Sequence, residues 1–122
     1  MKLLNKSYIE IKKSKFYGYL YEIESTDEVK TIIENIKKEN KGYRHIPYAY
    51  YFKNTAGKSD DKEPGNISIS FLNNLERNNL NSHLVVVLRY YGGVKLGASN
   101  LSRVYGKCAS DVIKDYLSNH NN

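Results

Sequence analysis

The chain has 122 residues, of which 40% are hydrophobic and 26% are charged, which is enough for one domain core and too few for two. No apolar run approaches the roughly 20 residues that a membrane-spanning helix needs, and a single cysteine excludes an internal disulfide bond. Because residues 1–6 lack the apolar segment of a secretory signal, we expect a cytoplasmic protein without a membrane partner.

The formal net charge of +6 at pH 7 has two interpretations. An excess of Lys and Arg favours an anionic partner such as RNA. An AT-rich genome would produce the same excess, because its codons enrich Lys, Asn, Ile and Tyr. The charge by itself leaves both interpretations open.

Two extended segments are predicted near the N-terminus. Ile9 and Ile11 alternate with polar residues between residues 7 and 13, which is typical of a half-buried strand. Side chains also alternate from residue 16 to 23, where one face carries Tyr17, Tyr19 and Tyr21. The polar residues between the two segments fit either a hairpin or one long bent strand.

A helix and a third strand follow. Ser25 and Glu28 have the spacing of a capping box, and Gly42 is suited to end the helix. Four apolar residues between them share one helical face: Val29, Ile32, Ile33 and Ile36. Pro47 has no N–H to donate, so it predicts the start of a strand over residues 48–53, which includes Tyr48 and Tyr50.

Residues 54–65 are polar and predict an exposed loop with three carboxylates, Asp60, Asp61 and Glu63. A short helix is predicted over residues 68–77, with Ser68 or Ser70 as its cap. The carboxylates are expected to be solvated, to pair with basic residues of the following segment, or to bind a divalent cation through oxygen ligands.

Five consecutive aliphatic residues at 84–88 predict a strand that is buried on both faces. The strand ends at Arg89 and is followed by Gly92, Gly93 and Gly97, and then by a helix predicted over residues 99–118. Cys108 lies on the apolar stripe of that helix and is predicted to be a core residue.

The segment LVVVLRYYGGVKLGASNLSRVYG, residues 84–106, resembles the signature of the IMPACT family of YigZ-like proteins. Three shorter segments fit the same family in the same order, namely KSKF at 13–16, HIPYAY at 45–50 and SDDKEP at 59–64. The resemblance covers about residues 7–117. We therefore expect one domain over residues 1–118 and a frayed tail at 119–122, without the second, ferredoxin-like domain that most YigZ-like proteins have.

The resemblance implies an α+β fold like the second domain of ribosomal protein S-five and the fourth domain of elongation factor G. That fold is a two-layer sandwich with helices on one face of a four-stranded, mostly antiparallel sheet, and it contains a left-handed crossover. Eukaryotic members of the family restrain a stress-activated translation kinase by competing for its activator. This chain departs from the family at Lys62, Ser99 and Asn100, where members usually carry glycine.

The candidate sites form three groups. An anion- or nucleic-acid-binding surface is predicted at Arg89, Gly92, Gly93, Lys95, Arg103 and Lys107. The alternative for the turn is structural, with Gly92 and Gly93 at positive φ. The acidic loop is expected to face that surface through Asp60, Asp61 and Glu63, and a stacking platform is predicted from Tyr17, Tyr19, Tyr21, Tyr48 and Tyr50.

These features predict a non-enzymatic binding module that regulates translation and binds RNA, the ribosome or a translation factor. One alternative is a small phosphate- or metal-dependent enzyme that uses the acidic loop against the Arg/Lys cluster. Another is a protein–protein regulator that uses its tyrosine face. No catalytic residue, metal site or cofactor is predicted, because the spacing of the His and Cys residues fits no zinc or hydrolase motif.

Overall fold

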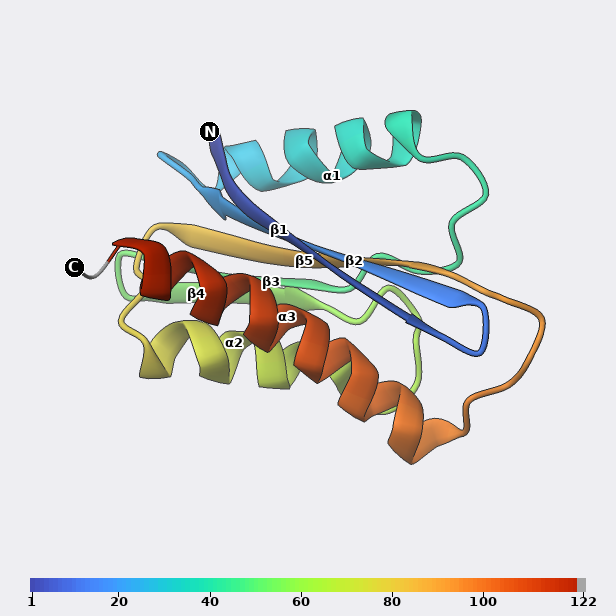
Figure 1. Cartoon of the computed structure of the whole chain (residues 1–122). Coiled ribbons are helices and arrows are strands. Elements are labelled where there is room, and N and C mark those ends of the chain that lie inside the picture. Colours follow the sequence, from blue (N-terminus) through green and yellow to red (C-terminus); the bar gives the residue numbers. More distant parts are fainter. Residues whose placement is uncertain (121–122) are drawn as a thin grey trace.

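The computed structural model describes residues 1–120, which form five strands and three helices. The strands are β1 (Lys2–Ile11), β2 (Ser14–Glu22), β3 (Tyr48–Phe52), β4 (Thr55–Ser59) and β5 (His83–Tyr90), and the helices are α1 (Asp27–Glu39), α2 (Ile67–Arg77) and α3 (Ala98–His120). The strands pair antiparallel in the order β1-β2-β5-β3-β4 (Figure 1). The α+β class and the antiparallel sheet are confirmed, with five strands where four were expected.

The arrangement of helices differs from the expected two layers, because helices cover both faces of the sheet (Figure 1). α2 and α3 pack on the face that carries Val85 and Val87, whereas α1 packs on the face that carries Leu84, Val86 and Leu88. The reason is local to β5. Its five consecutive aliphatic residues leave no polar face, so both sides of the sheet require an apolar cover.

The two helical connections across the sheet have opposite hands. β2 and β3 each pair antiparallel with β5, so they run parallel to each other and α1 connects them. β4 and β5 each pair antiparallel with β3, so they are also parallel and α2 connects them. If both helices lay on one face, the two connections would have the same hand. Because they lie on opposite faces, one crossover is left-handed, as the resemblance implies.

The two N-terminal segments form a hairpin rather than one bent strand. β1 begins at Lys2, whereas the prediction placed its start at residue 7, and it pairs with β2 over its length. The turn consists of Lys12 and Lys13, which have φ values of 46° and 69°. Two successive residues at positive φ are typical of the tight hairpin turns that match strand twist.

Three other boundaries differ from the prediction. β4 lies within the predicted loop. Its sequence TAGKS has no hydrophobic alternation that would predict a strand, and its strand conformation depends on pairing with β3. α2 begins at Ile67, with Ser68 buried in its first turn. α3 continues through His120, so Asn119 and His120 of the expected tail are helical, and residues 121–122 lie outside the described part. None of the helices among residues 1–120 is long and apolar enough to cross a bilayer.

Candidate functional site

The loop after β4 folds against the end of β5 and places a carboxylate in the interior. Oε2 of Glu63 accepts a hydrogen bond from Nη1 of Arg89 at 2.8 Å and another from the Tyr105 hydroxyl at 2.6 Å. Nε2 of His45 lies 3.8 Å from the same oxygen. The segments at 45–50, 59–64 and 84–106 therefore meet at one point, which we call the Glu63 cluster.

The Glu63 cluster is almost fully removed from solvent. The exposed fractions are 5% for Glu63, 6% for Arg89 and 0% for Tyr105. Burial, together with the hydrogen bond to Glu63, raises the pKa of the Tyr105 phenol above its ordinary value. The tyrosine therefore stays protonated and donates to the carboxylate. Of the polar contacts expected for the acidic loop, pairing with Arg89 is the one that the structure contains.

The other two carboxylates of the loop hold the chain in place, so the predicted loop is exposed over much of its length but its carboxylates are engaged within the protein. Oδ1 of Asp60 accepts a hydrogen bond from the backbone N–H of Ser68 at 2.7 Å, and a second from its hydroxyl, which caps the start of α2. Oδ2 of Asp61 accepts from the Ile46 N–H at 2.7 Å. Neither expected cap, Ser68 or Ser70, performs that role with its own side chain.

The glycine pair after β5 is required for two different reasons. Gly93 has a φ of 93°, as predicted for a tight turn, and an added Cβ would have no atom within 4 Å. Gly92 does not have positive φ. Its backbone instead lies against the β1–β2 turn, where an added Cβ would come within 2.1 Å of the Lys13 carbonyl carbon. Its N–H donates to the Ser14 hydroxyl at 3.0 Å, so that group is not free for a ligand.

The six residues of the predicted basic surface do not form one surface. Arg89 is buried in the Glu63 cluster, and it lines a pocket of about 320 Å³ at the start of α3 together with the exposed Lys95. Arg103 and Lys107 lie exposed on α3, where Arg103 donates to the Asn100 side chain and Lys107 donates to Asp111 at 2.9 Å. Neither of them lines that pocket.

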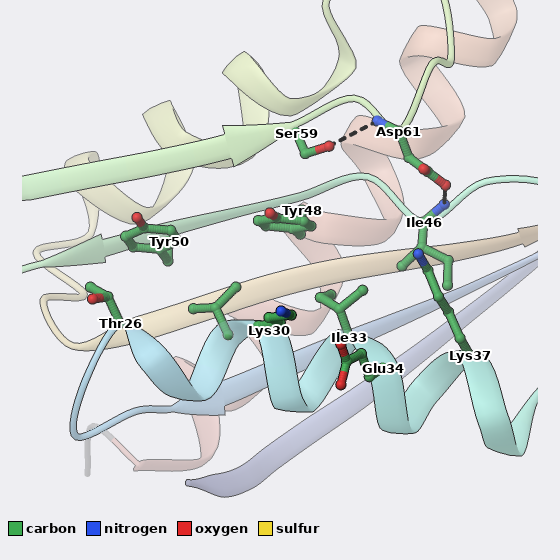
Figure 2. A pocket seen from close by; sticks show the side chains of 11 residues that line it. Thr26, Lys30, Ile33, Glu34, Lys37, Ile46, Tyr48, Tyr50, Ser59 and Asp61 are labelled. Atoms are coloured by element: carbon green, nitrogen blue, oxygen red, sulfur yellow. Dashed lines mark hydrogen bonds between the residues drawn. The ribbon is translucent and has the colours of Figure 1, made fainter.

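The five tyrosines of the predicted platform share the sheet face of Leu84, but α1 crosses that face and divides them. Tyr48 and Tyr50 line a groove of about 530 Å³ between α1 and β3, and Figure 2 shows them extending from β3 toward the helix. The charges in this groove are balanced, because Lys30 and Lys37 face Glu34 and Asp61.

Beyond the end of α1, the same sheet face is not covered by a helix and forms two adjoining grooves. Their volumes are about 390 Å³ and 500 Å³, and both are lined by Tyr17 and Asn40. We call these residues together the tyrosine–lysine surface, which consists of Lys6, Ser7, Tyr8, Lys13, Lys15, Tyr17, Tyr19, Asn40, Tyr90 and Tyr91. No carboxylate lines either groove, and Glu10 accepts a hydrogen bond from Tyr8 beside them.

The rings of this surface support one another. The ring centroids of Tyr8 and Tyr17 are 4.8 Å apart, and those of Tyr17 and Tyr90 are 6.1 Å apart. Nζ of Lys6 lies 5.6 Å from the Tyr19 ring centroid. The sequence prediction included Tyr17 and Tyr19 and missed Tyr8 and Tyr90. Tyr90 is separated from Leu84 and Leu88 by an even number of positions, so the alternation of side chains along the strand places it on the same sheet face and could have predicted it.

The His and Cys side chains, which could serve in metal binding or nucleophilic catalysis, have structural surroundings instead. Within residues 1–120, no three His, Cys, Asp or Glu side chains gather in a metal-holding group. Cys108 is buried, and burial raises the pKa of its thiol to about 11. Nδ1–H of His45 donates a hydrogen bond to the Asp61 carbonyl oxygen at 2.7 Å. The predicted core position of Cys108 is confirmed.

Comparison with known proteins gives consistent similarities. A model of the Impact N-terminal domain matches residues 12–113. The chain is 36% identical over 107 residues to the IMPACT family member YvyE of Bacillus subtilis, covering 84% of this chain and 49% of that protein. It is 33% identical over 111 residues to the IMPACT family member YigZ of Escherichia coli, covering 86% and 54%.

A solved structure described as a crystal structure of a hypothetical protein has a TM-score of 0.85 and 28% sequence identity to this chain. The match covers 93% of this chain and 61% of that one. The chain spans about half the length of the curated relatives that it matches.

Proposed function

Because the chain belongs to the IMPACT family, we propose that it is a translation-associated binding module that holds single-stranded RNA on the tyrosine–lysine surface. The observation that carries this proposal is the pair of adjoining grooves lined by five tyrosines and three lysines without a carboxylate. The link to translation rests on the family resemblance, which implies that eukaryotic members restrain a translation kinase by competing for its activator.

The tyrosines supply the base contacts in this proposal. Aromatic side chains on an open sheet face stack with unpaired bases, and each stacked base contributes about 1–3 kcal/mol. Tyr8 is 49% exposed and packs beside Tyr17, so its ring is both accessible and held in position. Duplex RNA hides its bases, so the grooves favour a single strand.

The lysines supply the phosphate contacts. Lys6, Lys13 and Lys15 are exposed at the edges of the two grooves. Cations beside stacking rings allow a strand to lie with its bases on the sheet and its phosphates at the rim. The predicted surface on α3 is less suitable, because Arg103 and Lys107 have no aromatic groove between them and hydrogen-bond to Asn100 and Asp111.

The enzyme alternative has less support. Each carboxylate of the acidic loop already has partners within the protein, with Glu63 on Arg89 and Tyr105, Asp60 on Ser68, and Asp61 on Ile46. One oxygen of each carboxylate is engaged in these bonds, which hold the loop against β5, α2 and Ile46. These contacts favour a structural role for the loop.

The test is a titration of short single-stranded RNA against the whole chain at two salt concentrations. We expect salt-dependent binding that Lys13→Glu/Lys15→Glu abolishes, whereas Arg103→Glu/Lys107→Glu, with the same change of charge, leaves it largely intact. Tyr8→Ala should weaken binding by about 1–3 kcal/mol without changing the salt dependence. Each lost phosphate contact should reduce the slope of log K against log salt by about 0.7.

Two results would overturn the proposal. One is the absence of salt-dependent RNA binding. The other is a greater loss from the α3 pair than from the hairpin lysines, which would return the site to the surface predicted from the sequence. Recovery of one specific protein after nuclease treatment, with no RNA binding, would instead identify a protein-binding regulator.

A further inference from the structure

A separate pocket shares Tyr91 with the tyrosine–lysine surface. It has a volume of about 320 Å³ and lies between the loop after β4 and the start of α3. We call it the α3 pocket, and its lining includes Arg44, Glu63, Arg89, Tyr91, Lys95 and Ala98. Three of these residues are cations and one is a carboxylate, so the charge of the lining is +3 − 1 = +2.

The start of α3 contributes backbone donors to this pocket. Gly97 and Ala98 line it, and the first hydrogen bond of the helix runs from the Leu101 N–H to the Gly97 carbonyl at 2.9 Å. Within the described residues, the N–H groups of Ala98, Ser99 and Asn100 have no acceptor. The first turn carries no acidic residue. Unpaired N–H groups and the helix dipole make this end favourable for an anion.

Arg89 contributes a buried and incompletely paired cation to the wall of this pocket. Its side chain is only 7% exposed and lines the α3 pocket, with Nη1 bonded to Glu63. Its Nε–H is buried and has no acceptor among the described residues. Charged donors are seldom left unpaired in protein interiors, because the lost solvation is costly. The single carboxylate of Glu63 offsets only part of this buried charge, so the field of Arg89 favours an oxyanion in the pocket that it lines.

We propose that the α3 pocket binds a phosphate monoester. The lining charge of +2 matches a phosphate monoester, which carries about −1.5 to −2 at pH 7. Lys95 and Arg44 approach from the exposed side, while the helix amides and Arg89 form the inner wall. Leu96, Pro64 and Leu101 complete the lining with apolar surface for the organic part of the ester.

The ester has two potential sources, which share this chemistry. One is a free small molecule. The other is the terminal phosphate of a strand on the tyrosine–lysine surface, because Tyr91 lines both that surface and the α3 pocket. The pocket does not depend on the RNA proposal for its charge or geometry, so the two proposals fail separately.

The test uses calorimetry with a nucleoside monophosphate, and with matched RNAs that end in a 5′ phosphate, a 3′ phosphate or hydroxyls only. We expect at least one phosphorylated probe to bind, and Lys95→Ala and Arg44→Ala each to weaken it about tenfold. Lys114→Ala is the matched control, because Lys114 is an exposed lysine of α3 outside the pocket.

The outcomes separate the sources. Stronger binding of a phosphorylated RNA than of its hydroxyl counterpart supports a strand end as the ligand, provided that Lys95→Ala and Arg44→Ala lose the difference and Lys114→Ala keeps it. Binding of the monophosphate, with all three RNAs equal, supports a free ester. The proposal is overturned if no phosphorylated probe gains affinity over its unphosphorylated form, or if Lys95→Ala and Lys114→Ala behave alike. Binding of hydroxyl-ended RNA would still support the RNA proposal in that case.

Discussion

At the scale of single residues, the carboxylate of Glu63 compensates the buried positive charge of Arg89. The Glu63→Ala variant leaves the guanidinium buried without its carboxylate and the Tyr105 hydroxyl without its acceptor. We expect this variant to lose about 3–5 kcal/mol of unfolding free energy, and Tyr105→Phe to lose about 1–3 kcal/mol. Denaturant unfolding measures both losses.

A double variant tests whether the loss comes from the uncompensated charge. Removing the cation as well, in Glu63→Ala/Arg89→Met, should recover part of the stability, because a buried ion pair and its apolar replacement have similar free energies. If the double variant is less stable than Glu63→Ala alone, the cluster contributes through packing rather than through charge.

Little of the Glu63 cluster was predictable from local sequence. Glu63 follows two aspartates and a lysine in a polar stretch, and composition of that kind indicates a solvated loop. Its partners Arg89 and Tyr105 lie 26 and 42 positions away. Local patterns contain no information about such pairs. Pairing of the acidic loop with the basic residues after it was one of the expected alternatives, and the fold shows that Glu63 makes this pair with Arg89.

At the scale of elements, the turn after β5 is packed against the β1–β2 hairpin. We expect Gly92→Ala to cost about 1–3 kcal/mol, because its Cβ would force the Lys13–Ser14 backbone to move. Gly93→Ala should cost about 1–2 kcal/mol through strain at positive φ, with no displacement of the hairpin. Amide chemical shifts of Lys13 and Ser14 distinguish the two variants.

The contrary result would be unchanged shifts of Lys13 and Ser14 in Gly92→Ala. In that event the close approach of the two turns would not constrain the hairpin.

Local periodicity predicted the elements that bury the most apolar surface. α1 was predicted from the helical spacing of residues such as Ile32, and β5 was predicted from its uninterrupted aliphatic run, which includes Val86. β4 was missed, since pairing with β3 defines it. The cap of α2 was also missed, because Asp60 lies 8 positions before Ser68 and reaches it through the loop.

At the scale of the whole molecule, the buried tyrosines and cysteine make stability depend on alkaline pH. Burial raises the pKa of Tyr19 from 10.0 to about 12 and that of Cys108 from 9.0 to about 11. Both groups lose their protons at lower pH in the unfolded chain than in the folded one. Their contribution is therefore complete below about pH 9 and is lost as pH rises through about 11–12.

Denaturant unfolding at a series of alkaline pH values measures this dependence, and tyrosinate absorbance reports the ionisation directly. The Tyr19→Phe variant should show a shallower fall in unfolding free energy above about pH 10 than the native chain. A flat native curve over that range would contradict the assigned burial of these groups.

The central position of β5 also bears on the order of assembly. β5 is the last strand in the chain, yet it pairs with both β2 and β3 in the middle of the sheet. Until residues 83–90 emerge during synthesis, the β1–β2 hairpin and the β3–β4 hairpin share no hydrogen-bonded neighbour. Both apolar faces of the sheet are completed only when β5 inserts between β2 and β3, so folding should be slow and all-or-none. A nascent chain that stops before His83 would expose two open strand edges, which makes it a substrate for chaperones or for aggregation.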